Sequence, residues 1–212
     1  PLNKLICASN QNNVLTDFIT TGTYDRNRDF YVTTSPSMDI LISSNLERLL
    51  YLLGGRSDKK LRGYMSELST KGVYTVEKDV LNALQTEFAA GCADDEQTSR
   101  TIGDTFRKTG YLCDTHTAVA IKVYQDYAEK TGDHTPTVIA STASPFKFAG
   151  SVLPAIGVQP QGDDFAMLSE LSDASKLPAP KALAELKDKK ERFTAVVEPE
   201  GMKQAVADWL SK

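Results

Sequence analysis

Three polar loops of this 212-residue chain carry hydroxyl, carboxylate and imidazole groups, which could bind a ligand or move a proton. They are residues Thr34 to Ser37, Asp114 to Thr117 and Ser141 to Ser144. Asp114 and His116 lie two positions apart, a spacing that permits acid/base or metal chemistry. A helix cap beside a half-buried histidine is the commoner reason for such a pair. Ser144 before Pro145 is likewise a common pair at the first turn of a helix.

Each polar loop follows a short apolar segment and precedes a stretch with helical periodicity. The apolar segments 30–33, 110–113 and 137–140 predict strands, and segment 5–8 is arguably a fourth. Repeated strand–loop–helix units indicate an α/β fold with a mostly parallel sheet flanked by helices. Ligands of such sheets bind at the carboxyl ends of the strands. We therefore expect the three loops to share one site.

Residues that commonly begin or end helices support these units. Asp114 is a good helix cap, Pro145 suits a first helical position, and Gly132 suits a helix end. Ser37 is a plausible cap for the helix that follows the first loop. The predicted helices cover residues 38–53, 116–130 and 146–153.

The rest of the chain divides into an insertion and a tail. Residues 45–109 predict a helical insertion, with helices near 59–68, 77–88 and 95–108. We expect residues 1–157 to form one domain that includes this insertion. Residues 158–212 would be a carboxyl-terminal extension packing on the same domain. The predicted elements of that extension are helices 181–189 and 201–209 and a strand at 193–197.

Composition excludes several classes of function. The formal net charge is -4, from 28 acidic and 24 basic side chains, so no basic excess indicates a nucleic-acid or membrane partner. No apolar run is long enough to span a bilayer, and no signal peptide opens the chain. The chain has two histidines and three widely spaced cysteines, so we expect neither a metal site nor a disulfide framework. We expect a cytoplasmic location, where cysteines stay reduced.

Four blocks of sequence resemble bacterial and fungal threonine synthases, in the order found in that family. They are residues 4–18, 34–48, 110–120 and 141–148. The resemblance implies part of the large domain of a pyridoxal 5'-phosphate (PLP) enzyme of fold type II, similar to the tryptophan synthase β group. It also implies that the chain is a carboxyl-terminal fragment of such an enzyme.

The implied reaction converts O-phosphohomoserine and water to threonine and inorganic phosphate. In this family PLP acts as the electron sink, while the protein supplies orientation and electrostatics. The resemblance therefore implies PLP as cofactor and O-phosphohomoserine as substrate. It leaves the oligomeric state open.

The resemblance also assigns expected positions around the cofactor. Asp114 and His116 match a block near the nitrogen side of the ring. Thr115 stands where the family pattern has proline, and threonine keeps the capping geometry possible. The loop expected to flank the ring consists of Thr34, Ser35, Pro36 and Ser37.

Neutral hydroxyls are expected to face the pyridine nitrogen. Thr142 matches this position, and Ser144 is the alternative in the same register. A neutral hydroxyl suits the pyridine nitrogen, because a carboxylate would stabilise a protonated pyridinium instead. Asn45 and Arg48 are candidates for binding the substrate phosphate, since Arg and amide donors commonly bind phosphates.

The family's Schiff-base lysine and its glycine-rich phosphate loop match no segment of this chain and are expected upstream of Pro1. We therefore expect that the chain alone cannot hold PLP covalently and is inactive. Two alternatives remain open. One is a non-catalytic binding or regulatory module of the same fold, and the other is a related PLP lyase with a different substrate.

Overall fold

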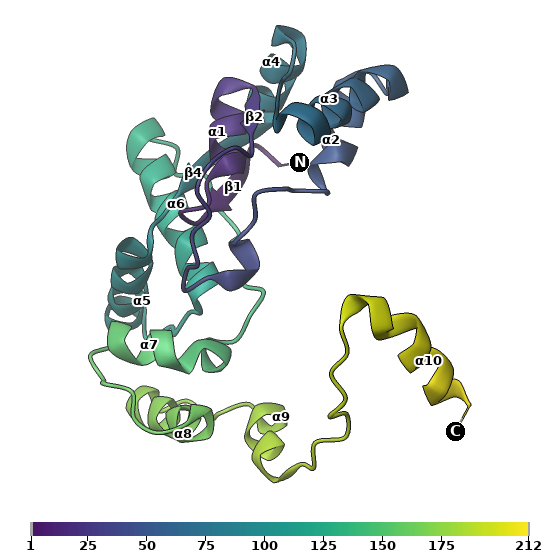
Figure 1. Ribbon diagram of the computed structural model, residues 1–212. Helices are drawn as coiled ribbons and strands as arrows, with labels where there is room; N and C mark the ends of the chain where they lie inside the picture. The colour runs from purple at the N-terminus through teal and green to yellow at the C-terminus, as the bar shows by residue number, and fades with distance from the viewer. Residues whose placement is uncertain (1, 212) are drawn as a thin grey trace. The chain divides into compact units, whose positions relative to one another are not determined.

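The computed structural model describes residues 2–211, and its compact units are Pro1–Ala179 and Pro180–Lys212. The first unit contains strands and helices, and the second contains helices (Figure 1). In chain order the elements of the first unit are β1 (Leu5–Ser9), α1 (Val14–Thr21), β2 (Thr23–Asp25), η1 (Pro36–Met38), α2 (Leu46–Leu53), α3 (Asp58–Lys71), β3 (Val73–Thr75), α4 (Lys78–Glu87), β4 (Phe88–Cys92), α5 (Asp95–Thr109), α6 (Thr115–Thr131), η2 (Pro145–Phe148), α7 (Ala149–Ala155) and α8 (Asp164–Ser175).

A parallel two-stranded sheet, β1 with β4, lies at the centre of the first unit. Its register runs from Leu5 opposite Phe88 to Ser9 opposite Cys92. Side chains alternate between the two faces of a strand, so neighbours along β1 join different clusters. Cys7 packs into the cluster that contains α1, whereas Ile6 packs with α6. Helices therefore cover both faces, as parallel sheets require, and Figure 1 shows α1 and α6 beside the strands.

Gly91 permits close packing of α6 on β4. A Cβ atom at this position would lie 2.9 Å from Val123 Cγ1. The Gly91 carbonyl also accepts a hydrogen bond of 2.8 Å from the Thr16 hydroxyl on α1. The small residues of β4 thus allow both covering helices to approach the sheet.

An aromatic cluster forms the core between α1 and the antiparallel pair β2–β3. The rings of Tyr24 and Tyr74 stack with centroids 5.3 Å apart, and Tyr64 stacks on Tyr74 at 5.4 Å. Phe18 closes the cluster at 5.8 Å from Tyr74. The Tyr24 hydroxyl accepts a hydrogen bond of 2.9 Å from the Ser43 N–H. The cluster therefore also holds the segment that leads from η1 to α2.

Most of the predicted strands are not strands in the part of the chain that the structure describes. Segments 30–33, 110–113, 137–140 and 193–197 have no ladder pairing, and the predicted mostly parallel sheet is reduced to two strand pairs. A strand needs a neighbour with free N–H and C=O groups, and apolar periodicity does not supply one. Val138, for example, is 95% exposed. Conversely, β4 is a strand, although the sequence analysis predicted none between the helices near 77–88 and 95–108.

The helix predictions were more accurate than the strand predictions. Asp114 caps α6, and Gly132 ends it with a left-handed φ of 69°. The helix predicted from residue 38 begins only at Leu46, because η1 and the Asp39 side chain direct the chain elsewhere first. The range 45–109 contains β3 and β4 besides its helices, and its role as an insertion stays a prediction. So does the division at residue 157.

The second unit is helical within its described residues. Its elements are α9 (Lys181–Ala184), η3 (Glu185–Asp188), η4 (Pro199–Gly201) and α10 (Met202–Leu210). The apolar side chains of α10, including Trp209, are exposed. Among the described helices, none is both long enough and apolar enough to cross a bilayer.

Candidate functional site

The three polar loops lie together in the structure. The Ser37 N–H donates to His116 Nε2 at 3.3 Å, which joins the first loop to the start of α6. The Thr117 and Ser141 hydroxyls lie 3.0 Å apart and form a hydrogen bond, which joins α6 to the third loop. Three segments that are far apart in sequence therefore form one polar surface.

Asp114 is fully buried and is the N-cap of α6. Its Oδ1 accepts hydrogen bonds from the backbone N–H groups of His116 at 2.9 Å and Thr117 at 3.2 Å. Its Oδ2 accepts from the Thr117 hydroxyl. A carboxylate is stabilised at a helix amino terminus, both by these bonds and by the helix dipole. Both oxygens are thus used within the protein, and Asp114 shapes the loop.

His116 links the cap to the first loop through both ring nitrogens. Nδ1 lies 3.2 Å from Asp114 Oδ1, and Nε2 accepts from the Ser37 N–H. With Nε2 accepting from the first loop, Nδ1 is the ring nitrogen placed to interact with the Asp114 carboxylate. The ring packs against Phe148 with centroids 4.9 Å apart. The imidazole is therefore fixed in orientation, and only 10% of it is exposed.

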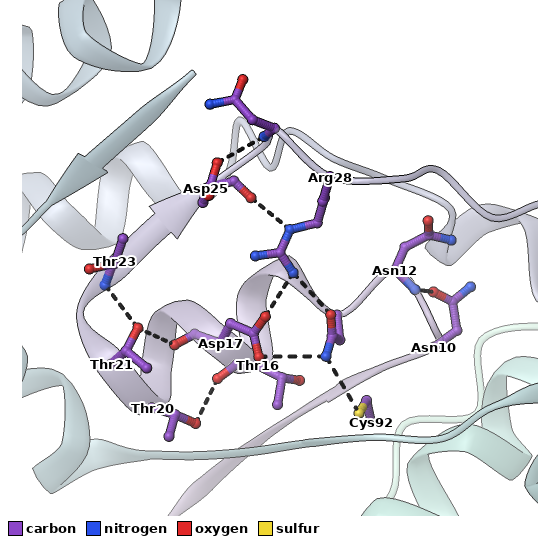
Figure 2. Close-up of polar contacts among 12 residues, drawn as sticks. Asn10, Asn12, Thr16, Asp17, Thr20, Thr21, Thr23, Asp25, Arg28 and Cys92 are labelled. Atoms are coloured by element: carbon purple, nitrogen blue, oxygen red, sulfur yellow. Dashed lines mark hydrogen bonds and ion pairs between the residues drawn. The ribbon is translucent and has the colours of Figure 1, made fainter. Parts of the chain in front are cut away.

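Asp39 holds the first loop against the end of β1. Its Oδ1 accepts from Asn10 Nδ2 at 2.6 Å, Asn12 Nδ2 at 3.0 Å and Thr33 Oγ1 at 2.7 Å. Its Oδ2 accepts from the Thr33 N–H at 3.0 Å. The Asn12 N–H in turn donates to Asn10 Oδ1, a contact drawn in Figure 2. The sequence analysis did not predict this network. The sequence feature that could have indicated it is the pair Asn10 and Asn12, which follows directly after an apolar strand.

Thr34 and Ser35 differ in how their hydroxyls are used. The Thr34 hydroxyl and N–H both donate to Asp95 on the first turn of α5, at 2.9 Å and 3.1 Å. Ser35 is fully buried, and its Oγ has no hydrogen-bond partner among the described residues. A buried hydroxyl without a partner is unusual in proteins. It fits a polar group bound at this loop, as expected for a segment that flanks a cofactor.

The remaining predicted cofactor residues lie on the open side of the loops. Pro36 and Ser37 are exposed on η1. Ser144 Oγ accepts a hydrogen bond of 3.3 Å from the Phe146 N–H and so caps η2. Thr142 is exposed, and within residues 2–211 its hydroxyl makes no hydrogen bond. Of the two hydroxyls predicted to face a pyridine nitrogen, Thr142 is thus the one free to do so.

Asn45 and Arg48 are not brought to the three loops. Arg48 Nη2 donates to Asn45 Oδ1 at 2.9 Å, and both side chains are exposed at the start of α2. That helix packs against α3 and α4. The structure therefore gives these two residues no contact with the candidate site.

Arg28 anchors the approach to the first loop on α1. Its guanidinium donates through Nη1 to Asp17 Oδ2 at 2.7 Å and to Asn13 Oδ1 at 3.0 Å, and through Nε to the Asp25 carbonyl at 2.7 Å. Figure 2 shows the Arg28 side chain between β2 and α1. This brace fixes the path of the chain just before residues 29–33.

Cys113 adjoins the site but is unsuited to nucleophilic chemistry. Burial, with a smaller effect of the Asp114 charge, raises the pKa of the Cys113 thiol to about 11. The thiol therefore stays protonated at neutral pH, and the thiolate is the nucleophilic form. Among the described residues, no group of three or more His, Cys, Asp or Glu side chains could hold a metal ion. Besides the carboxylates of Asp39, Asp95 and Asp114, which hold the loops, the polar groups of the site are hydroxyls, one imidazole and backbone groups.

Comparison with known proteins connects this geometry to one family. The family model described as "Threonine synthase, C-terminal" matches residues 117–206. Human threonine synthase-like 1 is 41% identical over 160 residues, which cover 75% of this chain and 21% of the human protein. Threonine synthase of Saccharomyces cerevisiae is 34% identical over 227 aligned residues, covering 100% of this chain and 42% of the yeast protein.

A solved structure agrees with these matches. The crystal structure of PLP-bound threonine synthase from Brucella melitensis superposes with a TM-score of 0.80 at 36% sequence identity. The match covers 99% of this chain and 40% of that one. This chain thus spans well under half the length of these three relatives. The chain belongs to the threonine synthase family, and it corresponds to the carboxyl-terminal region of its members.

Proposed function

We propose that this chain supplies one wall of the active site of a PLP-dependent threonine synthase. The whole enzyme would convert O-phosphohomoserine and water to threonine and phosphate. The observation that carries the proposal is the meeting of the three polar loops, in a chain similar over 99% of its length to part of a PLP-bound threonine synthase. When bound, PLP would supply the electron sink for the carbanion chemistry.

The residues of the chain would orient the cofactor. Thr142 would donate to the pyridine nitrogen, because its hydroxyl is exposed and free. Ser35 and Ser37 would flank the ring on the first loop. His116, oriented by the Ser37 N–H and by Asp114, would present a fixed polar edge beside them. A neutral hydroxyl partner places no negative charge beside the pyridine nitrogen and so does not favour its protonated form.

Water exclusion is the second contribution that we propose for this wall. Phe148 packs on the His116 ring, and Phe146 is buried at the start of η2. An apolar backing behind a polar surface lowers the local dielectric constant and strengthens each hydrogen bond to the ligand. The wall would therefore present its few polar groups in a partly dry setting.

The isolated chain, we propose, does not catalyse the reaction. The cofactor lysine of the family matches no lysine here, so the chain alone would bind PLP at most reversibly. An absorbance scan after PLP addition and gel filtration tests this. The eluted protein should show no PLP absorbance band near the boundary between ultraviolet and visible light. A stable band of this kind that coelutes with the protein would refute the proposal.

A chimera tests the function itself. The carboxyl-terminal 42% of yeast threonine synthase would be replaced by this chain, and phosphate release from O-phosphohomoserine would be measured. The Thr142→Val variant should lower kcat about tenfold to a hundredfold, because a hydrogen bond to a polarised group contributes about 1.5–3 kcal/mol. Thr70→Val, an exposed threonine on α3, is the matched control and should leave kcat unchanged.

The alternatives predict different results in the same assay. A non-catalytic module would give a folded chimera that neither retains PLP nor releases phosphate. A related lyase would retain PLP but act on another phosphorylated or hydroxylated amino acid. A PLP-loaded chimera that releases no phosphate from O-phosphohomoserine would therefore contradict the threonine synthase assignment.

A further inference from the structure

The three polar loops and the turns that follow them contain a single Lys or Arg side chain, that of Lys147. These segments are residues 34–41, 114–121 and 141–148. Their acidic residues are Asp39 and Asp114, whose carboxylates accept hydrogen bonds from neighbouring groups of the chain. The charge that these segments can offer to a ligand is therefore the ammonium group of Lys147.

Lys147 lies on η2, between two phenylalanines that fix its place. Phe146 is buried, and the Phe148 ring packs on the His116 ring with centroids 4.9 Å apart. The Lys147 side chain itself is exposed, and its Nζ lies 5.3 Å from the centroid of the Phe148 ring. A cation over an aromatic face is attracted to that face. Phe148 thus contacts both the ammonium group and the imidazole of the candidate site.

The Lys147 ammonium has no anionic partner in the part of the chain that the structure describes. Ion pairs with Asp or Glu are formed there by Lys60, Lys71, Lys122, Lys181 and Lys189. Asp114, which contacts His116, is fully buried and bonds to backbone and hydroxyl groups instead. An unpaired lysine on a surface is common by itself. Lys147 differs because it is held at the candidate site by Phe148.

The proposed substrate supplies an anionic partner for Lys147. A phosphate monoester carries a charge of about −1.5 to −2 at pH 7, and proteins bind it through Lys or Arg and through N–H donors. The two residues expected for this role, Asn45 and Arg48, bond to each other at the start of α2 and make no contact with the loops. We propose that Lys147 binds the phosphate group of O-phosphohomoserine and thereby selects a phosphorylated substrate. The inference rests on the proposed function, because it assigns a substrate contact within the same site.

This contact should act on substrate binding more than on the chemical step. The phosphate carries its charge already in the free substrate, so an ammonium partner stabilises the bound substrate and the transition state alike. Loss of such uniform binding raises KM and leaves kcat nearly unchanged. A residue that only shaped the fold would instead lower kcat and cofactor retention together.

Steady-state kinetics of the chimera of this chain with the yeast amino-terminal part test the role of Lys147. Lys147→Met removes the charge and keeps the length of the side chain. It should raise the KM for O-phosphohomoserine about tenfold to a hundredfold, with kcat changed less than about threefold. Lys147→Arg retains the charge and should restore most of the affinity. Lys130→Met is the matched control and should leave KM unchanged, since Lys130 is exposed at the opposite end of α6.

Two inhibitors separate binding of the phosphate from binding of the amino acid. Inorganic phosphate should compete with the substrate in the parent chimera, and Lys147→Met should weaken this inhibition about tenfold or more. Homoserine lacks the phosphate, so it should inhibit both proteins equally. Higher ionic strength should raise the KM of the parent chimera more than that of Lys147→Met, because salt screens the exposed cation.

Acetylation of lysines supplies a readout that needs no turnover. Inorganic phosphate added to the chimera should slow the reaction of Lys147 with an acetylating reagent about fivefold or more near saturation, as followed by mass spectrometry. Sodium chloride at equal ionic strength is the control for screening and should slow it less. Lys130 in the same sample is the internal reference, and phosphate should not slow its acetylation.

Three results would overturn the inference. These are equal effects of Lys147→Met and Lys130→Met, a lower kcat for Lys147→Met at unchanged KM, and acetylation of Lys147 that phosphate does not slow. If the parent chimera releases no phosphate from the substrate, the proposed function fails, and acetylation alone then decides whether Lys147 binds phosphate. Protection of Lys147 in an inactive chimera would therefore support the contact and reject the activity.

Discussion

Asp114→Ala should destabilise the first unit by more than the loss of an ordinary helix cap. Removing an N-cap side chain costs about 1 kcal/mol. The same carboxylate also accepts from the Thr117 hydroxyl and lies 3.2 Å from His116 Nδ1, and it is fully buried. Leaving such buried donors without an acceptor adds roughly 1–2 kcal/mol. We therefore expect a total loss of about 2–3 kcal/mol.

Asp163→Ala is the matched control for this variant. Asp163 caps α8 in the same unit, but it is exposed and accepts one bond of 2.8 Å, from the Ala166 N–H. Its replacement should cost about 1 kcal/mol, the usual value of a cap. The difference between the two variants isolates the contribution of the contacts that Asp114 makes to His116 and Thr117.

Urea unfolding followed by circular dichroism measures both variants. With a slope near 2 kcal/mol per molar urea, Asp114→Ala should lower the midpoint by about 1–1.5 M and Asp163→Ala by about 0.5 M. Equal shifts for the two variants would show that the buried network adds nothing to the cap. The structural account of the His116 orientation would then be wrong.

Three further predictions concern packing and ionisation. Gly91→Ala should destabilise the chain by about 1–3 kcal/mol in urea unfolding, because the new Cβ would lie 2.9 Å from Val123 Cγ1. Gly63→Ala is the control. A Cβ there would have nothing within 4 Å, so this change should stabilise α3 by about 0.5–1 kcal/mol. At pH 8 a thiol reagent should label exposed Cys92 well before Cys113. Because the pKa of Cys113 is raised from 9.0 to about 11, its contribution to stability should be complete below pH 9 and lost as the pH rises to 11. A Cys113→Ala variant should show a smaller loss, and the part that remains comes from other groups with raised pKa values, such as the Cys7 and Cys92 thiols.

Local signals in the sequence predicted the helices well. A cap such as Asp114 and a helix end such as Gly132 act within one or two turns, so the residues themselves carry the information. The same holds for Pro145, which does begin a helical turn. Ser37 is an exception, because the helix that it was expected to cap begins only at Leu46, after Asn45.

Pairing between strands could not be predicted in this way. Segment 137–140 has a strand-like sequence, yet its partner edge is absent from the described residues. The strand β4 has the plain sequence Phe-Ala-Ala-Gly-Cys, and it forms because β1 and two helices pack around it. Strand formation is thus decided by contacts far away in sequence, which periodicity does not report.

The candidate site shows the same division. The three loops were expected together because strand ends meet at one edge, and the bonds of Ser37 to His116 and of Thr117 to Ser141 join them. The role of Asp39 was not foreseen, since it depends on two asparagines more than 25 residues upstream that meet it only after folding. Cofactor contacts for the predicted residues stay a prediction.

The most direct test of the central claim is growth of a yeast strain that lacks its own threonine synthase. The strain would carry the chimera in which this chain replaces the carboxyl-terminal 42% of the yeast enzyme. We predict growth without added threonine, and none when the chimera lacks these 212 residues. A soluble, PLP-loaded chimera that fails to support growth, while the intact yeast enzyme does, would contradict the claim.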